Sequence, residues 1–137
     1  MNAWDTVQAG WGINDTIAYQ GSYCAKGSPN SGRFLEKDIS TQVKGRIHFN
    51  VRVLDATDDS YLCVPLDGAG LKYLYLIYDD NFKYHDGAWK NFPIPTVPLD
   101  NTWYDADLTF NWATDKYKVY VDDVFKGEIT TITANSL

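Results

Sequence analysis

Polar residues that could hold a ligand alternate with apolar residues along two stretches of the chain. The polar members of the first stretch are Arg46, His48, Asn50 and Arg52. In the second stretch, Asp105 and Asp107 flank Ala106. Alternation with a period of two is typical of a strand with one buried face, so the polar residues are expected to face away from the core. If both strands belong to one sheet, the two rows form a hydrogen-bonding surface suited to sugar hydroxyls; the alternative is a solvated face with weak ion pairs.

Aromatic side chains supply a second kind of contact, because flat rings with polar edges suit the apolar faces of a sugar. Tyr73 and Tyr75 share one face of the apolar stretch 71–78, and they line an outer sheet face if the leucines between them point inward. In the opposite register the two tyrosines belong to the core. Around the turn Asp86-Gly87, the candidate ligand-binding residues are Tyr84, His85 and Trp89. A Trp near a hairpin tip either binds a ligand or packs, here against Phe82 or Phe92.

Catalysis is not favoured by the sequence, and no catalytic residue is assigned. Glycoside hydrolysis needs two carboxylates placed across one cleft, whereas the chain has only two Glu, Glu36 and Glu128, far apart. Asp105 and Asp107 are the nearest substitute, but pairing with Arg46 and Arg52 is the favoured interpretation. No G-x-S-x-G nucleophile motif accompanies either His. A polysaccharide-degrading enzyme is therefore the less favoured alternative.

Metal binding is limited to a structural Ca²⁺, the one cofactor that the sequence leaves open. Calcium needs six to eight oxygen ligands. The acidic loops are Asp55 with Asp58 and Asp59, Asp79-Asp80, and Asp122-Asp123. None has the spacing of an EF-hand, and solvated loops are the alternative. Zinc is not expected, because Cys24 and Cys63 lack zinc-ligand spacing; they either pair in a secreted protein or remain two buried thiols.

Composition and charge narrow the class of partner. The chain has 137 residues, 45% of them hydrophobic and 15% aromatic, with a formal net charge of -6. This charge argues against nucleic acid and anionic membrane surfaces as partners. No apolar run approaches the ~20 residues of a membrane span, and the first residues show no signal-peptide pattern. We therefore expect a glycan or a protein partner.

The remaining pattern predicts a single all-β domain over residues 1–137. Expected strands are 46–53, 61–64, 71–78, 105–111, 117–122 and 124–131. Pro93, Pro95 and Pro98 exclude a central strand between them. Leu35, Ile39 and Val43 fit a helical spacing, but the β-rich surroundings favour a strand over 33–39. Many short strands predict a two-sheet antiparallel β-sandwich.

Two segments resemble known families. Residues 11–25 look like the opening of jelly-roll modules, and the segments NTWYDADLTF at 101–110 and YKVYVDDV at 117–124 are similar to a signature of concanavalin A-like (LamG-like) lectins and glucanases. Asp123 departs from that signature, where a hairpin Gly is usual, although Asp tolerates a left-handed conformation. The resemblance implies a jelly roll and places Trp103 in the core, while Trp112, beside a loop, is a candidate exposed ring.

These observations together predict a non-catalytic, lectin-like carbohydrate-binding module of an extracellular or cell-surface protein. The alternative from another class is a structural or adhesion sandwich domain of a surface, appendage or viral-spike assembly. In that alternative the aromatic face buries a protein partner rather than a sugar.

Overall fold

The computed structural model describes the backbone of thirteen strands and the side chains of residues 42–53, 81–86 and 88–130. Outside these side-chain ranges it describes the backbone at 6–7, 11–14, 24–27, 35–36, 60–66, 72–79 and 132–133. The chain divides into two compact units, Met1–Ser40 and Thr41–Leu137. Every strand pairing among the described residues is antiparallel, so this part of the chain is all-β, as predicted. Whether residues 1–137 form one domain stays a prediction.

The first unit holds two short ladders. Strands β1 (Thr6–Val7) and β4 (Leu35–Glu36) form one pair, and β2 (Trp11–Asn14) and β3 (Cys24–Gly27) form the other. The strand interpretation of residues 33–39 is therefore confirmed at 35–36, and the rest of that stretch lies outside the described residues. Cys24 lies on β3 and Cys63 on β6 (Ser60–Leu66), and their pairing stays untested because their side chains are not described.

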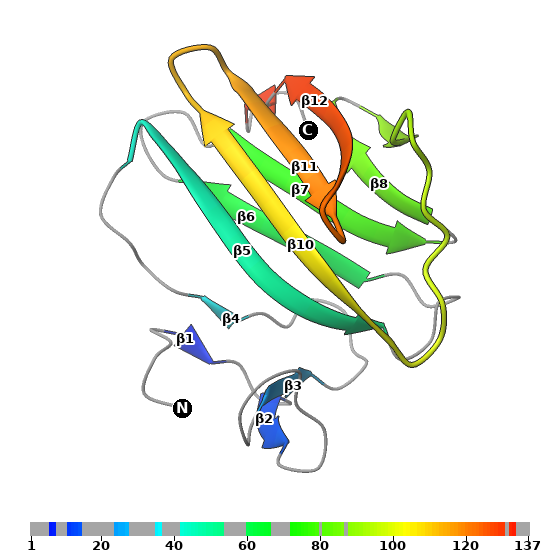
Figure 1. The fold of residues 1–137 in the computed structure, drawn as a ribbon. Coiled ribbons are helices and arrows are strands. Elements are labelled where there is room, and N and C mark those ends of the chain that lie inside the picture. Colours follow the sequence, from blue (N-terminus) through cyan, green and yellow to red (C-terminus); the bar gives the residue numbers. More distant parts are fainter. Residues whose placement is uncertain are drawn as a thin grey trace. The chain divides into compact units, whose positions relative to one another are not determined.

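A four-stranded sheet in the second unit has the strand order β12-β11-β10-β5 (Figure 1). Its strands are β5 (Lys44–Val53), β10 (Thr102–Asn111), β11 (Lys116–Val121) and β12 (Val124–Thr130). The two longest strands, β5 and β10, pair over their full ten residues, from Thr102 opposite Val53 to Asn111 opposite Lys44. The strands expected from alternation at 46–53 and 105–111 are thus confirmed, and the one expected at 117–122 is confirmed as far as Val121.

Tight turns connect the strands of this sheet. The turn between β11 and β12 is made by Asp122 and Asp123, whose φ angles of 51° and 60° lie in the left-handed region. Asp can occupy this region more readily than most residues, so the chain forms the hairpin without the usual glycine. The register between β11 and β12 shifts between Val119 and Tyr120 of β11. Lys126 of β12 is therefore an extra, bulged residue, and Phe125 lies opposite Tyr120.

A five-stranded sheet lies in the same unit. Strand β7 (Lys72–Asp79) is central, with β6 along one edge and β8 (Asn81–His85) and β13 (Ile132–Thr133) along the other. Strand β9 (Trp89–Asn91) continues from β8 as a hairpin. The expected central strand is therefore confirmed over 72–78. A hairpin around Asp86 is also confirmed, but β9 begins at Trp89, so three residues rather than two separate it from β8.

Side chains from both sheets form the described core. Its buried members on the four-stranded sheet are Val53, Tyr104, Ala106, Leu108, Phe110, Tyr117, Val119, Val121 and Ile129. Phe82 of β8 packs edge-on against Tyr104 of β10, with ring centroids 5.1 Å apart. Burial of such rings is the main stabilising term for a core of this kind.

The proline-containing segment 92–101 forms no strand, as expected, and is fixed at several points. Phe92 and Pro98 are buried. The backbone N–H of Phe82 donates to the carbonyl of Thr96 at 3.0 Å, and the N–H of Leu99 donates to the Tyr104 hydroxyl at 2.7 Å. The segment therefore lies along β8 and next to the start of β10.

Two tryptophans differ from their expected places. Trp103 lies on the outer side of β10, partly buried opposite Arg52, because the alternation puts its neighbour Tyr104 into the core. The expectation that Trp103 is a core residue is wrong. Trp112 is partly buried, not freely exposed, since its ring stacks on Phe110 with centroids 4.6 Å apart.

Within the described residues, no helix is long and apolar enough to cross a membrane.

Candidate functional site

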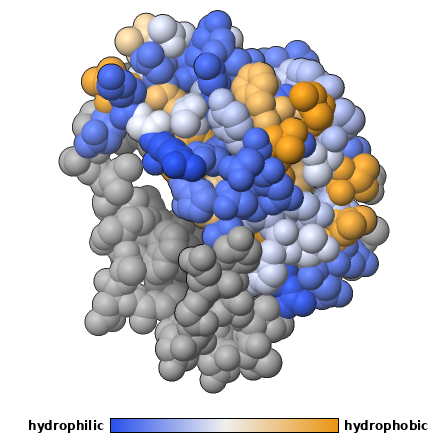
Figure 2. Space-filling model, in the orientation of Figure 1, coloured by the Kyte–Doolittle hydropathy of each residue, from blue (hydrophilic) through white to orange (hydrophobic). Residues whose placement is uncertain are grey.

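The two polar stretches lie on adjacent strands of one sheet. In the β5–β10 register His48 lies opposite Asp107, and Asn50 lies opposite Asp105. Their neighbours along β10, Ala106 and Leu108, are buried in the core, so the polar residues face away from it. We call this set the polar row; its members are Arg46, His48, Asn50, Arg52, Asp105 and Asp107. Figure 2 shows hydrophilic residues gathered over the middle of this sheet.

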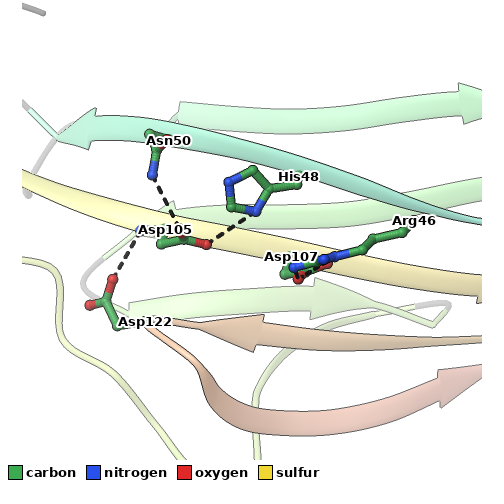
Figure 3. A network of polar contacts seen from close by, with 6 residues as sticks. All are labelled: Arg46, His48, Asn50, Asp105, Asp107 and Asp122. Carbon is green, nitrogen blue, oxygen red and sulfur yellow. Dashed lines mark hydrogen bonds and ion pairs between the residues drawn. The ribbon is translucent and has the colours of Figure 1, made fainter. Parts of the chain in front are cut away.

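The strongest contact in the polar row joins Arg46 and Asp107 (Figure 3). The Nε of Arg46 donates to Oδ2 of Asp107 at 2.6 Å, and a terminal guanidinium nitrogen contacts the same oxygen. The Asp107 side chain is 14% exposed and that of Arg46 is 63% exposed. The hydrogen bond and the charge of Asp107 raise the pKa of Arg46. The expected pairing of the carboxylates with the arginines is thus confirmed for this pair.

Asp105 is held from three sides. Its Oδ1 lies 3.4 Å from Nδ1 of His48, and its Oδ2 accepts a hydrogen bond from Nδ2 of Asn50, also at 3.4 Å. Its backbone N–H donates to Oδ1 of Asp122 at 2.9 Å (Figure 3), and the N–H of Asp122 donates to the Asp105 carbonyl. The β11–β12 turn is therefore hydrogen-bonded to β10 at Asp105, the residue of the polar row that contacts both His48 and Asn50.

Arg52 does not pair with a carboxylate of the row. Its Nε donates to the backbone carbonyl of Asn101 at 3.3 Å, and Nη2 donates to Oδ1 of the same residue at 3.4 Å. Its neighbour across the register is Trp103, and β10 begins only one residue earlier, so the turn before β10 supplies the acceptors. The pairing expected of Arg52 with Asp105 or Asp107 is therefore replaced by this contact with Asn101.

Two atoms of the polar row lack hydrogen-bond partners. Among the described residues, Oδ1 of Asp107 and Nη1 of Arg52 are shielded from solvent and make no hydrogen bond. An unsatisfied polar atom of this kind costs free energy, which a new partner can recover. The Arg46 side chain, which binds the other carboxylate oxygen of Asp107, is itself mostly exposed.

An aromatic pair beside the polar row was missed by the sequence reasoning. Tyr120 lies opposite Asp107 on β11, alternating with the buried Val119 and Val121, so it shares the outer face of the sheet. Its ring lies 5.3 Å from that of Phe125, which is 42% exposed. The alternation at 117–121 was a sufficient signal for Tyr120. The place of Phe125 depends on the bulge in β12, which the sequence pattern does not indicate.

The three candidates around the Asp86 turn separate onto two faces. Tyr84 packs against the core, with its ring 5.2 Å from that of Phe92. His85 and Trp89 lie opposite each other in the register and make an edge-on ring contact, with centroids 4.5 Å apart. Trp89 is 43% exposed. The structure therefore brings His85 and Trp89 together but does not place Tyr84 with them.

Tyr73 and Tyr75 lie on the central strand β7. Their backbones pair with those of Pro65 and Cys63 on β6. Their side chains lie outside the described residues, so the question of which face they occupy stays a prediction.

No group of three or more His, Cys, Asp or Glu side chains suited to a metal lies within the described residues. Asp122 is engaged with the backbone of Asp105. Asp55, Asp58, Asp59 and Asp80 lie outside the described residues, as does the side chain of Asp79. Calcium binding by these loops therefore stays a prediction.

Comparison of the chain with family models, with curated proteins and with solved structures finds no match. The expected resemblance to concanavalin A-like proteins therefore stays a prediction. The function is inferred from the chemistry of the outer face.

Proposed function

We propose that this chain is a non-catalytic carbohydrate-binding module that holds a glycan on the outer face of its four-stranded sheet. One observation carries the proposal: hydrogen-bonding groups and aromatic rings lie side by side on this face. Tyr120 lies directly opposite Asp107, and Phe125 extends the aromatic surface beyond it. Aromatic rings can pack against the apolar face of a sugar while neighbouring carboxylate, amide and guanidinium groups bind its hydroxyls.

The rigidity of the polar row supports this role. Asp105 and Asp107 alternate with fully buried residues of β10, and Asp105 is further tied to Asp122. A ligand therefore meets groups that are already positioned, which lowers the entropy cost of binding. Oδ1 of Asp107 is an acceptor without a partner among the described residues, so it has hydrogen-bonding capacity left for a glycan hydroxyl.

We further infer that the two sheets of the second unit pack as a β-sandwich of the jelly-roll type, as in concanavalin A-like lectins. The shared core of Phe82, Phe92 and Tyr104 supports the sandwich. The similarity at 101–110 and 117–124 supports the jelly roll. A sugar-binding role also fits an extracellular or cell-surface protein, the location we propose.

A second candidate function is that of a structural or adhesion domain with a protein partner. Its support is the exposed apolar side chains of the segment after β9, at Ile94, Val97 and Leu99. A contiguous exposed apolar patch is typical of protein contacts, and these three side chains lie on one short segment. In that case the chain forms a discrete assembly and binds no sugar.

The test begins with an array of plant and microbial glycans probed with the full chain. The affinity for the best hexasaccharide is then measured by calorimetry for wild type and for Tyr120→Ala. We expect at least a tenfold loss for Tyr120→Ala. The matched control is Lys90→Ala, which removes only an exposed ion pair with Asp86 and should keep the wild-type affinity. A chain that binds no glycan but forms a discrete oligomer in light scattering would favour the protein partner.

A further inference from the structure

The hairpin formed by β8 and β9 presents an exposed aromatic platform. Trp89 and His85 lie opposite each other in the register, and the His85 ring meets the Trp89 ring at an interplanar angle of 72°. This contact supports one side of the indole and limits its rotation. Trp89 is 43% exposed, so part of its surface is accessible to solvent.

This platform faces away from the core that the hairpin shares with β10. Phe82 and Phe92 are buried in that core. Because side chains alternate along a strand, Tyr84 shares the inward side with Phe82, whereas His85 takes the outward side. Trp89 lies opposite His85 and shares its side of the hairpin, whereas Phe92, just after β9, is buried in the core.

The polar row faces away from the same core on the other sheet. Tyr104, which precedes Asp105 on β10, points inward and contacts Phe82 of β8. The outward side of β10 and the outward side of β8 therefore lie on opposite sides of this contact. Two surfaces rich in sugar-binding chemistry thus point in opposite directions.

We propose that Trp89, supported by His85, is a second glycan-binding site, and that one chain cross-links two polysaccharide chains. The ligand class rests on the proposed function, but the site and the cross-linking are additional. A pyranose ring stacks on the open part of the indole. Since the two sites face opposite ways, a short oligosaccharide cannot occupy both at once. Each site instead takes its own glycan, and a long polymer is bound with avidity.

The experiment measures stoichiometry and cross-linking with named probes. The full chain is titrated with laminari-, xylo- and mannohexaose, and mixed with laminarin, arabinoxylan and mannan in a turbidity assay. For the sugar that binds, we expect two hexasaccharides per wild-type chain and turbidity with the matching polymer. Trp89→Ala should bind one hexasaccharide and give no turbidity, while Lys90→Ala on the same hairpin should behave as wild type.

The controls separate this inference from the proposed function. Trp89→Phe keeps a ring at the site and should retain part of the turbidity, which a loss caused only by unfolding would not show. The variant Arg52→Ala/Asp107→Ala should lose the polar-row site and keep the Trp89 site. One hexasaccharide per wild-type chain, or full turbidity with Trp89→Ala, would overturn the cross-linking. If Arg52→Ala/Asp107→Ala binds as wild type and Trp89→Ala loses all binding, the polar-row proposal fails and the chain has one site.

Discussion

Asp107 lies directly opposite His48 in the antiparallel register, yet its carboxylate binds Arg46, two positions away along β5. Asp105 repeats the offset, since it lies opposite Asn50 and also contacts His48. Long side chains reach such diagonal neighbours, and strand twist brings one diagonal closer than the other. The polar row is therefore a series of overlapping contacts, and removing Asp107 releases Arg46, which lies two positions along β5 from the residue opposite Asp107.

The first prediction concerns Gly45, which lies opposite Phe110 in the register. A Cβ at this position would lie 2.8 Å from Cζ of Phe110, whose buried ring is stacked on Trp112. Gly45→Ala should lower the free energy of unfolding by about 1–2 kcal/mol through overpacking. Urea denaturation measures this free energy. The loss of stability in Gly45→Ala/Phe110→Leu should be smaller than the sum of the losses in the two single variants. Additive losses would show that the added methyl group does not clash with the Phe110 ring.

The second prediction concerns the hydroxyl of Tyr104, which accepts a hydrogen bond from the Leu99 N–H at 2.7 Å. Tyr104→Phe should cost about 1 kcal/mol of unfolding free energy, because the buried contact is lost while the ring remains. Tyr84→Phe is the matched control, since its hydroxyl makes no hydrogen bond among the described residues. Equal stability of Tyr104→Phe and wild type in urea would contradict the role given to this contact.

The third prediction concerns the left-handed turn at Asp123, where φ is 60°. Glycine adopts this conformation without the steric cost of a side chain, although it loses more entropy on folding. Asp123→Gly should therefore raise the free energy of unfolding by about 0.5 kcal/mol, and Asp123→Ala should lower it. Thermal unfolding of both variants measures the effect. A less stable Asp123→Gly would mean that the Asp side chain, not the backbone, stabilises the turn.

Much of the fold could be predicted from residue alternation, because a half-buried strand repeats every two residues. That signal located β5, β10 and β11, and it identified the polar row. The same alternation indicates an outward Trp103, since Tyr104 shares its parity with the buried Ala106 and Leu108, whereas the family resemblance implies the opposite.

The rest depends on contacts between residues that are distant in sequence. The pairing of β5 with β10 and the contact of Arg52 with Asn101 require the strand register, which alternation does not specify. The exposure of Phe125 beside Tyr120 requires the bulge in β12. The separation of Tyr84 from Trp89 also depends on register, because a two-residue turn at Asp86-Gly87 would place Tyr84 opposite Trp89, whereas in the structure His85 lies opposite Trp89.

The fourth prediction concerns pH and Glu128. Hydrogen bonding to Lys116, together with the charges of Lys116 and Lys118, lowers the pKa of Glu128 below its usual 4.5. A carboxylate with a lowered folded-state pKa stabilises the protein above its unfolded-state pKa, and the stabilisation is lost as the pH falls through the folded-state value. Glu128→Gln should thus be less stable than wild type at neutral pH and equally stable in acid below the lowered pKa.

Denaturant midpoints at low salt measure this difference across the acidic range. The gap between wild type and Glu128→Gln should also shrink in high salt, because the three groups are exposed and their interactions are screened. A gap that is independent of pH would assign the effect of the substitution to something other than the charge of Glu128.

The most direct test of glycan binding by the polar row is calorimetric titration of Arg52→Ala/Asp107→Ala in the Trp89→Ala background. In that background the outer face of the four-stranded sheet is the one proposed site left. We expect the hexasaccharide affinity to fall at least tenfold, about 1.4 kcal/mol. The thermal midpoint should stay nearly unchanged, because the Arg46–Asp107 ion pair and the Arg52–Asn101 hydrogen bonds are surface contacts, which contribute little to stability. An affinity equal to that of Trp89→Ala alone would contradict the assignment of this face as the binding site.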